Sequence, residues 1–120
     1  RFLKSTLHFD NVKAKFGDSG DLQIYHNGSN SYIQDAGTGS LKILAQDLDI
    51  NNAAETASMI RAIDGAQVEL YYGGGKKLET KSTGINIQGV TEYANNTAAL
   101  AGGLVVGDVY RTGDDLKIVH

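Results

Sequence analysis

Apolar and polar residues alternate along most of the chain, and this alternation predicts β-strands. In residues 22–26, Leu22 and Ile24 alternate with Gln23 and Tyr25, which places His26 on the aliphatic side of the strand. Asp-Gly, Asn-Gly and Gly-Gly pairs separate such runs and supply the positive φ that tight turns need. The pattern therefore predicts a mainly β fold. Further strand-like runs lie at residues 41–44, 48–50, 59–63, 67–72, 76–80 and 85–87.

A helix is predicted only near the end of the sequence. Residues 98–101 read Ala-Ala-Leu-Ala, the preceding Asn95, Asn96 and Thr97 can cap a helix, and a Gly-Gly pair ends it. A hairpin is expected to follow, with strands at residues 104–110 and 116–120 and a turn at 111–114. Residues 91–120 are therefore predicted to form a helix-plus-β-hairpin module. Residues 53–61 remain open between a strand and one or two helical turns.

The sequence contains an internal repeat. At an offset of 46 positions, Leu22, Ile24, Tyr25, His26 and Gly28 correspond to residues of similar kind in the second half of the chain. Those partners are Val68, Leu70, Tyr71, Tyr72 and Gly74, and the same offset matches Tyr32 with Leu78. After the turn the offset falls to 44, which matches residues 41–43 with 85–87. We therefore expect a two-copy β-repeat over residues 15–90, with residues 1–14 as a lead-in segment.

Composition favours association over a single dense core. The 120 residues include Gly 15, Pro 0, one methionine and no tryptophan, and aromatic residues make up 8%. Large side chains are scarce, so each segment is expected to bury its apolar side against a neighbouring chain. We therefore predict an obligate oligomer.

Charge and cysteine content exclude several partners. The net charge is −3 and the Lys+Arg 11 are dispersed, so there is no basic stripe for nucleic acid. No apolar run approaches the roughly 20 residues that a membrane span needs. With Cys 0, disulfides and thiolate metal sites are excluded.

Two motifs resemble catalytic or metal sites but have simpler explanations. Residues 17–20 spell Gly-Asp-Ser-Gly, as around a serine-protease nucleophile, yet they fall between two predicted strands and are interpreted as a turn. Asp47, Asp49 and Asn51 begin like a calcium loop, but Ser58 stands where a bidentate Glu is needed. The sequence therefore predicts no catalytic, cofactor or metal site and no enzyme.

The histidines lack partners at metal-ligand spacing. His8, His26 and His120 stand alone, although three copies of His26 around a trimer axis would form a ring. A packed His26 at a corner of the repeat is the preferred interpretation, because Tyr72 occupies the matching place.

Six residues are candidates for partner contact. Tyr25 with His26 and Tyr71 with Tyr72 could form aromatic platforms for sugars, although their recurrence in the repeat favours corner packing. Arg111 and Asp114 are the polar candidates in the terminal hairpin. Residues 76, 77 and 81 are lysines that are expected on a solvated surface.

Three parts of the sequence together resemble the modules of one known protein family. The first contains Lys15-Phe16-Gly17-Asp18 and DLQIYHNGSNSYI at residues 21–33, followed by a glycine turn at 37–41. The second comprises residues 68–72, 76–80 and 83–85, and the third comprises 98–104, 109–114 and 116–120. These parts resemble modules of virion fibre proteins from tailed phages, marine and cyanobacterial ones especially. The resemblance implies an elongated, repeat-built, trimeric β shaft, often a β-helix or triangular prism, on a tail or capsid.

The resemblance implies that this chain is a phage virion structural protein. It would be a homotrimeric tail fibre or fibre-like appendage that contacts other virion proteins and a host surface glycan or protein receptor. A capsid-bound decoration protein or head fibre without a receptor role stays open, as does a tailspike glycan depolymerase. Residues 1–3 do not resemble a virion-anchoring domain, so either a C-terminal portion of a longer protein or a short decoration protein is expected.

Overall fold

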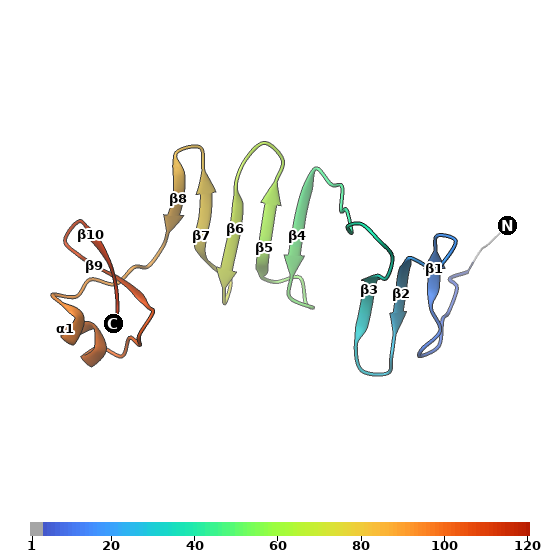
Figure 1. Ribbon diagram of the computed structural model, residues 1–120, viewed down its shortest axis with the longest axis horizontal. Helices are drawn as coiled ribbons and strands as arrows, with labels where there is room; N and C mark the ends of the chain where they lie inside the picture. Colours follow the sequence, from blue (N-terminus) through green and yellow to red (C-terminus); the bar gives the residue numbers. More distant parts are fainter. Residues whose placement is uncertain (1–3) are drawn as a thin grey trace. The chain divides into compact units, whose positions relative to one another are not determined.

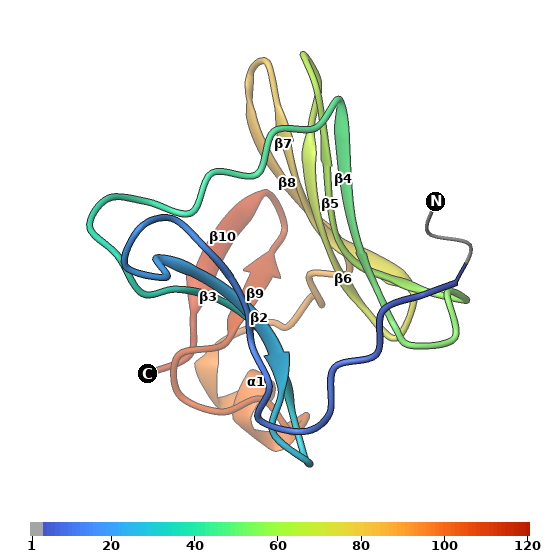
Figure 2. The same ribbon diagram turned by 90° about the vertical axis from the view of Figure 1, so that its right-hand side faces the viewer.

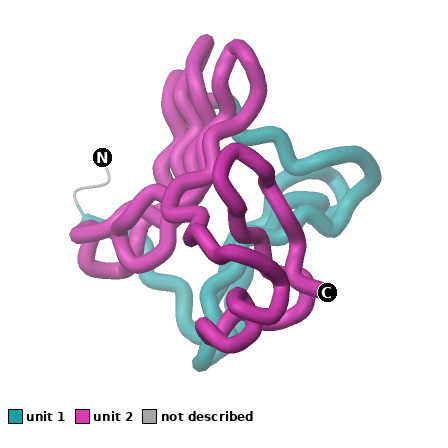
Figure 3. The backbone as a smooth tube through the Cα atoms, turned by 90° about the vertical axis from the view of Figure 1, so that its left-hand side faces the viewer, with its two compact units in different colours: residues 1–44 teal, residues 45–120 magenta. Residues whose placement is uncertain are grey.

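The computed structural model describes residues 4–120, and the predicted mainly β class is confirmed (Figure 1). The first three residues of the predicted lead-in segment lie outside this range. The chain divides into two units, residues 1–44 and 45–120 (Figure 3). The predicted domain boundaries near residues 14 and 90 stay predictions. The elements are β1 (Ala14–Phe16), β2 (Leu22–His26), β3 (Ser31–Asp35), β4 (Asp47–Asn51), β5 (Ser58–Ile63), β6 (Val68–Tyr72), β7 (Gly75–Lys81), β8 (Gly84–Ile87), α1 (Asn96–Ala101), β9 (Val109–Thr112) and β10 (Asp115–Ile118).

The first unit contains a three-stranded antiparallel sheet in the order β1-β2-β3. Its β2–β3 hairpin turns through the Asn-Gly pair that the sequence suggested. The Asn27 side-chain oxygen accepts hydrogen bonds from the backbone N–H groups of Ser29 (3.0 Å) and Asn30 (2.8 Å), and Gly28 adopts a φ of 90°. The loop is therefore held by its own asparagine.

The second unit contains a five-stranded antiparallel meander in the order β4-β5-β6-β7-β8. Gly73 and Gly74 form the two-residue connection between β6 and β7, with φ of 57° and 79°. Positive φ at both central residues is the requirement of a type I′ hairpin turn, which matches the twist of the flanking strands. These two glycines therefore fix how β6 and β7 pair.

The two copies of the repeat share strand register on one side of the turn. Ala14 faces Ile24 between β1 and β2, and 46 residues later Ile60 faces Leu70 between β5 and β6. After the turn the registers diverge, because residues 27–30 connect β2 to β3 whereas two glycines connect β6 to β7. A register shift at Leu70/Tyr71 adds to the difference.

One predicted match within the repeat is therefore wrong. Leu78 pairs with Leu70 as Ile33 pairs with Ile24, so the counterpart of Leu78 is Ile33 and the expected Tyr32–Leu78 match fails.

One predicted strand does not form, and another begins later in the chain than expected. Residues 41–44 have no regular structure, since no neighbouring strand pairs with them, and Leu44 is 87% exposed. Strand β9 begins only at Val109, because the Asp108 N–H bonds the Val105 carbonyl (3.0 Å) in a turn. Residues 53–57 form a turn, which settles the open segment without a helix.

The predicted helix and terminal hairpin are both present, and Figure 2 shows α1 beside β9 and β10. The Asn95 side chain accepts a hydrogen bond from the Ala98 N–H (2.9 Å) and caps α1, as expected. Within the described chain, the buried hydrophobic residues are Ala99, Tyr110 and Val119, all in this region. The protein's apolar core is therefore very small.

Candidate functional site

The five-stranded sheet has one aliphatic side, which we call the aliphatic face. Residues directly opposite in an antiparallel pair lie on the same side of the sheet, so the strand registers define two rows across all five strands. Six of these ten side chains are exposed, five of them to about 40% and Ile85 to 62%, and the other four are half-buried. The first row is Ile50, Ile60, Leu70, Leu78 and Ile87, and the second is Leu48, Ala62, Val68, Thr80 and Ile85.

The opposite side of the same sheet is charged, and we call it the polar face. Glu69 and Glu79 face one another across β6 and β7 and are only 3% and 8% exposed. The Lys76 ammonium lies between them, 2.9 Å from Glu69 Oε1, and also bonds Glu79 Oε2. The Tyr71 hydroxyl donates to Glu69 Oε2 at 2.6 Å. The covered groups of this sheet are therefore ionic, whereas its aliphatic side chains face outward.

Hydrogen bonds and charge fix the ionisation of this network. The Tyr71 hydroxyl first, and the Lys76 ammonium second, lower the pKa of Glu69 to about 2. Lys76 and then Lys81 lower the pKa of Glu79. The two carboxylates raise the pKa of Lys76, Glu79 more than Glu69. All three groups are therefore charged at neutral pH. A carboxyl group that acts as a general acid needs a raised pKa, whereas the pKa values of Glu69 and Glu79 are lowered.

The position of Lys76 corrects one sequence expectation. It was predicted on a solvated surface, but its side chain is only 27% exposed and joins the two glutamates. The prediction failed because an exposed lysine and a bridging lysine look alike in a single strand. Lys76 reaches Glu69 only because β7 pairs with β6, where Lys76 lies opposite Tyr71 and Glu79 lies opposite Glu69.

The sheet of the first unit has the same two-sided plan. Ala14, Ile24 and Ile33 form one row, while Tyr25 and Tyr32 lie on the other side. The two tyrosine rings stack with centroids 4.7 Å apart and planes 13° apart. Lys13 Nζ lies 4.3 Å from the centroid of the Tyr25 ring, and the Tyr25 hydroxyl donates to Gln34 Oε1 (3.1 Å). The Tyr25 ring is therefore engaged within its own sheet.

The structure does not bring the members of the predicted aromatic pairs to one surface. Tyr25 and His26 are consecutive strand residues and point to opposite sides of their sheet, as do Tyr71 and Tyr72. His26 Nδ1 lies 3.0 Å from Ser31 Oγ, and Tyr72 is 81% exposed on the side of Leu70. Neither pair offers a continuous platform for a sugar ring.

The two candidate residues of the terminal hairpin, Arg111 and Asp114, lie in different local environments. Arg111 lies within strand β9 rather than in the turn where it was expected, and its guanidinium pairs with Glu92 Oε2 at 2.6 Å. Asp114 is exposed in the turn between β9 and β10. Sequence reasoning missed Glu92, because the bridge that brings it beside Arg111 joins distant parts of the chain.

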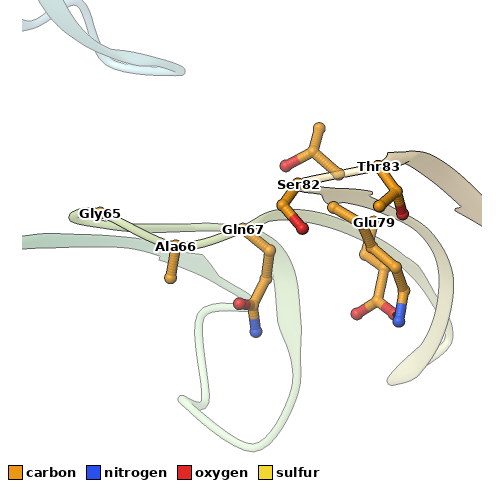
Figure 4. Close-up of a pocket in the computed structure, with 8 residues that line it drawn as sticks. Gly65, Ala66, Gln67, Glu79, Ser82 and Thr83 are labelled. Carbon is orange, nitrogen blue, oxygen red and sulfur yellow. Dashed lines mark ion pairs between the residues drawn. The ribbon is translucent and has the colours of Figure 1, made fainter.

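A polar cleft of about 580 Å³ lies at the turn end of the five-stranded sheet (Figure 4). It lies between the β5–β6 and β7–β8 turns, with Gln67 on one wall and Ser82 and Thr83 on the other. Glu79 reaches it with a carboxylate already bound to lysines. The cleft offers hydroxyl and amide groups, and the sequence contained no signal for it. The remaining lining residues are Gly65, Ala66, Thr80 and Lys81.

The catalytic and calcium-like motifs occupy structural positions. Residues 17–20 form the β1–β2 turn, where the Gly20 N–H bonds the Gly17 carbonyl at 3.0 Å. Asp49 is a strand residue whose carboxylate pairs with Arg61 (3.2 Å). Across residues 4–120, no cluster of three or more potential metal-ligating side chains occurs. Over the same residues, no helix is long and apolar enough to cross a membrane.

Comparison of the chain with protein-family models, curated proteins and solved structures gave no match.

Proposed function

We propose that this chain is a structural segment of a homotrimeric phage virion appendage, a tail fibre or fibre-like protein that displays surfaces for host attachment. The observation that carries the proposal is the aliphatic face, which a single chain leaves exposed. The largest contiguous apolar patch on a soluble monomer, typically about 300–600 Å², is often a functional surface, and larger patches mark interaction sites. The sequence resemblance supplies the phage context.

The area of the aliphatic face indicates how much stability association provides. Five strands spaced about 4.8 Å apart, each of about five residues, cover roughly 400 Å². At about 25 cal/mol per Å², burying that face stabilises each copy by roughly 10 kcal/mol before the costs of association. The described core, by contrast, consists of Ala99, Tyr110 and Val119. Association would therefore supply apolar burial that the small core of the single chain lacks.

In such an assembly the polar face and the glycine turns are directed outward. A threefold arrangement repeats every outward group three times, so weak contacts with a host glycan or protein receptor add up through multivalency. The ion pairs on the polar face keep that surface ordered. The aliphatic face then serves assembly of the shaft, and the polar face serves display.

The proposal has a direct test in solution and on the virion. Light scattering at micromolar concentration is expected to give about 38 kDa, three times the 12.8 kDa of the chain. Antibody labelling of virions is expected to mark a tail or capsid appendage, and the purified protein is expected to compete with phage for host adsorption. A 12.8 kDa species at these concentrations contradicts the proposal.

One observation favours a second candidate, a capsid-bound decoration protein or head fibre without a receptor role. The aromatic residues proposed for sugar contact lie on opposite sides of their strands, so no sugar platform is formed. Capsid labelling without any competition for host adsorption would select this candidate. Release of sugars from host polysaccharide would instead indicate the depolymerase alternative.

A further inference from the structure

We infer that residues 41–44, Leu-Lys-Ile-Leu, are a closing strand that pairs with the free edge of β3 in the same chain and completes the first sheet. In the structure these residues are unpaired and their aliphatic side chains are exposed, so the closed arrangement is a second conformation of the segment. The inference goes beyond the proposed function and does not depend on it. It follows from the internal repeat, the strand registers and the unpaired edge of β3.

The first sheet lacks one member of an aliphatic row that the second sheet completes. In the second unit, four residues in register cross β5 to β8: Ile60, Leu70, Leu78 and Ile87. In the first unit, the corresponding row ends at β3 and contains three residues: Ala14, Ile24 and Ile33. The fourth position falls to Ile43, because residues 41–43 match 85–87 at the offset of 44.

The repeat also predicts which residues face one another in the closed sheet. Leu78 faces Ile87 between β7 and β8. The counterpart of Leu78 is Ile33 and that of Ile87 is Ile43, so Ile33 is expected to face Ile43. The next two pairs of β7 and β8, Glu79 with Asn86 and Thr80 with Ile85, correspond in the same way to Gln34 with Lys42 and Asp35 with Leu41. One register therefore accounts for the whole segment.

Closure covers exposed aliphatic side chains on both sides of the first sheet. Ile43 is 64% exposed in the structure, and in the closed sheet it lies beside Ile33 in the aliphatic row. Leu44 is 87% exposed, and the same register places it opposite Tyr32, whose ring already stacks on Tyr25. Removal of these side chains from water favours the closed arrangement.

The edge of β3 offers backbone groups for this pairing. The Ala36 N–H bonds the Asp21 carbonyl at 2.6 Å, which fixes the alternation of hydrogen-bonded pairs between β2 and β3. Because bonded and non-bonded pairs alternate along an antiparallel ladder, Ile33 and Asp35 direct their N–H and C=O groups away from β2. Among the described strands, β3 pairs with β2 alone. An open edge of this kind accepts a strand from any source, so closure also protects the first unit from pairing with other chains.

The residues between β3 and the closing strand can form the turn. With Asp35 opposite Leu41, residues 36–40 become a five-residue hairpin loop, Ala-Gly-Thr-Gly-Ser. Gly39 already adopts a φ of 115°, and the two glycines tolerate the backbone rotations that closure requires. So short a loop holds the segment close to β3, which favours pairing within one chain over pairing with a second chain.

Amide hydrogen exchange of the unmodified protein tests the closing strand directly. In the closed sheet, four amides form hydrogen bonds between the two strands: those of Ile33, Asp35, Leu41 and Ile43. The amides of Lys42 and Leu44 point away from β3. We expect the four bonded amides to exchange at least about tenfold more slowly than these two. Equal exchange rates for all six amides overturn the inference.

Cross-linking identifies the register and the chain that supplies the strand. The sequence has Cys 0, so introduced thiols have no competitors. Ile33→Cys with Ile43→Cys places two thiols at facing positions whose Cα atoms lie about 5.5 Å apart, within the range of a disulfide. Ile33→Cys with Lys42→Cys is the matched control, because neighbouring strand residues point to opposite sides. Under mild oxidation, linkage within one chain is expected in the first variant and is expected to be lost in the control.

Two other results of the cross-linking overturn the inference. Equal linkage in both variants means a loop without a fixed register. Linkage into a species of twice 12.8 kDa means that a second copy supplies the strand. Neither result bears on the proposed virion role, which is tested separately by labelling and adsorption. If faster exchange of the Gln34 amide shows that Ile33→Cys disrupts the β2–β3 pairing, Gln34→Cys with Lys42→Cys tests the same register at the adjacent pair.

Discussion

Val119 and Val106 provide the same substitution at a buried and an exposed site of one small structural region. Val119 is 1% exposed and packs with Ala99 and Tyr110, whereas Val106 is 73% exposed. Val119→Ala removes two carbon groups at about 0.8 kcal/mol each, and the cavity that remains raises the loss to about 2–3 kcal/mol. Val106→Ala removes the same atoms from water-exposed surface and should change stability by less than about 0.5 kcal/mol.

Amide hydrogen exchange measures this difference locally. The Val119 N–H bonds the Asp108 carbonyl, and the Gly107 N–H bonds the Val119 carbonyl, both at 2.9 Å. A loss of 2–3 kcal/mol corresponds to about 30- to 150-fold faster exchange of these amides. We expect that acceleration in Val119→Ala and almost none in Val106→Ala. Equal acceleration in both variants would refute the idea that the three-residue core holds the helix and hairpin together.

Three further predictions follow from the strands and the helix. Because the folded pKa of Glu69, about 2, lies below the ordinary value of 4.5, its network stabilises the fold above pH 4.5. That contribution is lost as the pH falls toward 2, so the thermal midpoint should drop over this window and drop less in Glu69→Gln. Gly73→Val forces a β-branched residue to a φ of 57° and should cost about 1–2 kcal/mol in denaturant unfolding, whereas Gly73→Asn should cost clearly less; equal losses would mean that this φ is not needed. Asn95→Ala should destabilise α1 by about 1 kcal/mol through loss of the cap, measured as faster exchange of the Ala98 amide, and Asn95→Asp should preserve it.

Local features of the sequence predicted the elements whose formation depends on nearby residues. The alternation at residues 22–26 predicted β2 and the correct side for His26, and Asn95 with the Gly-Gly pair predicted both ends of α1. Residues 41–44 show the limit of the same reasoning, because an apolar run becomes a strand only when another strand pairs with it. The Tyr32–Leu78 match failed because loop length and a register shift changed the pairing after the turn.

The residues of the polar network were visible in the sequence, but their relation was not. Glu69 and Glu79 lie on different strands, and only the β6–β7 register places them opposite one another with Lys76 between. The Glu92–Arg111 pair likewise depends on a bridge between distant segments. Such contacts depend on strand pairing, which a pattern of residue types does not specify.

The sequence by itself determined that each strand has an aliphatic and a polar side, because successive side chains on a strand point to opposite sides of the sheet. Only the tertiary structure decided which side the chain covers. In the five-stranded sheet, cross-strand ion pairs cover Glu69 and Glu79, and the rows of isoleucine, leucine and valine are left exposed. A single layer of strands can satisfy its charges within one side, but it has no second layer within the sheet to cover its aliphatic residues, and this is the physical reason for expecting further copies of the chain.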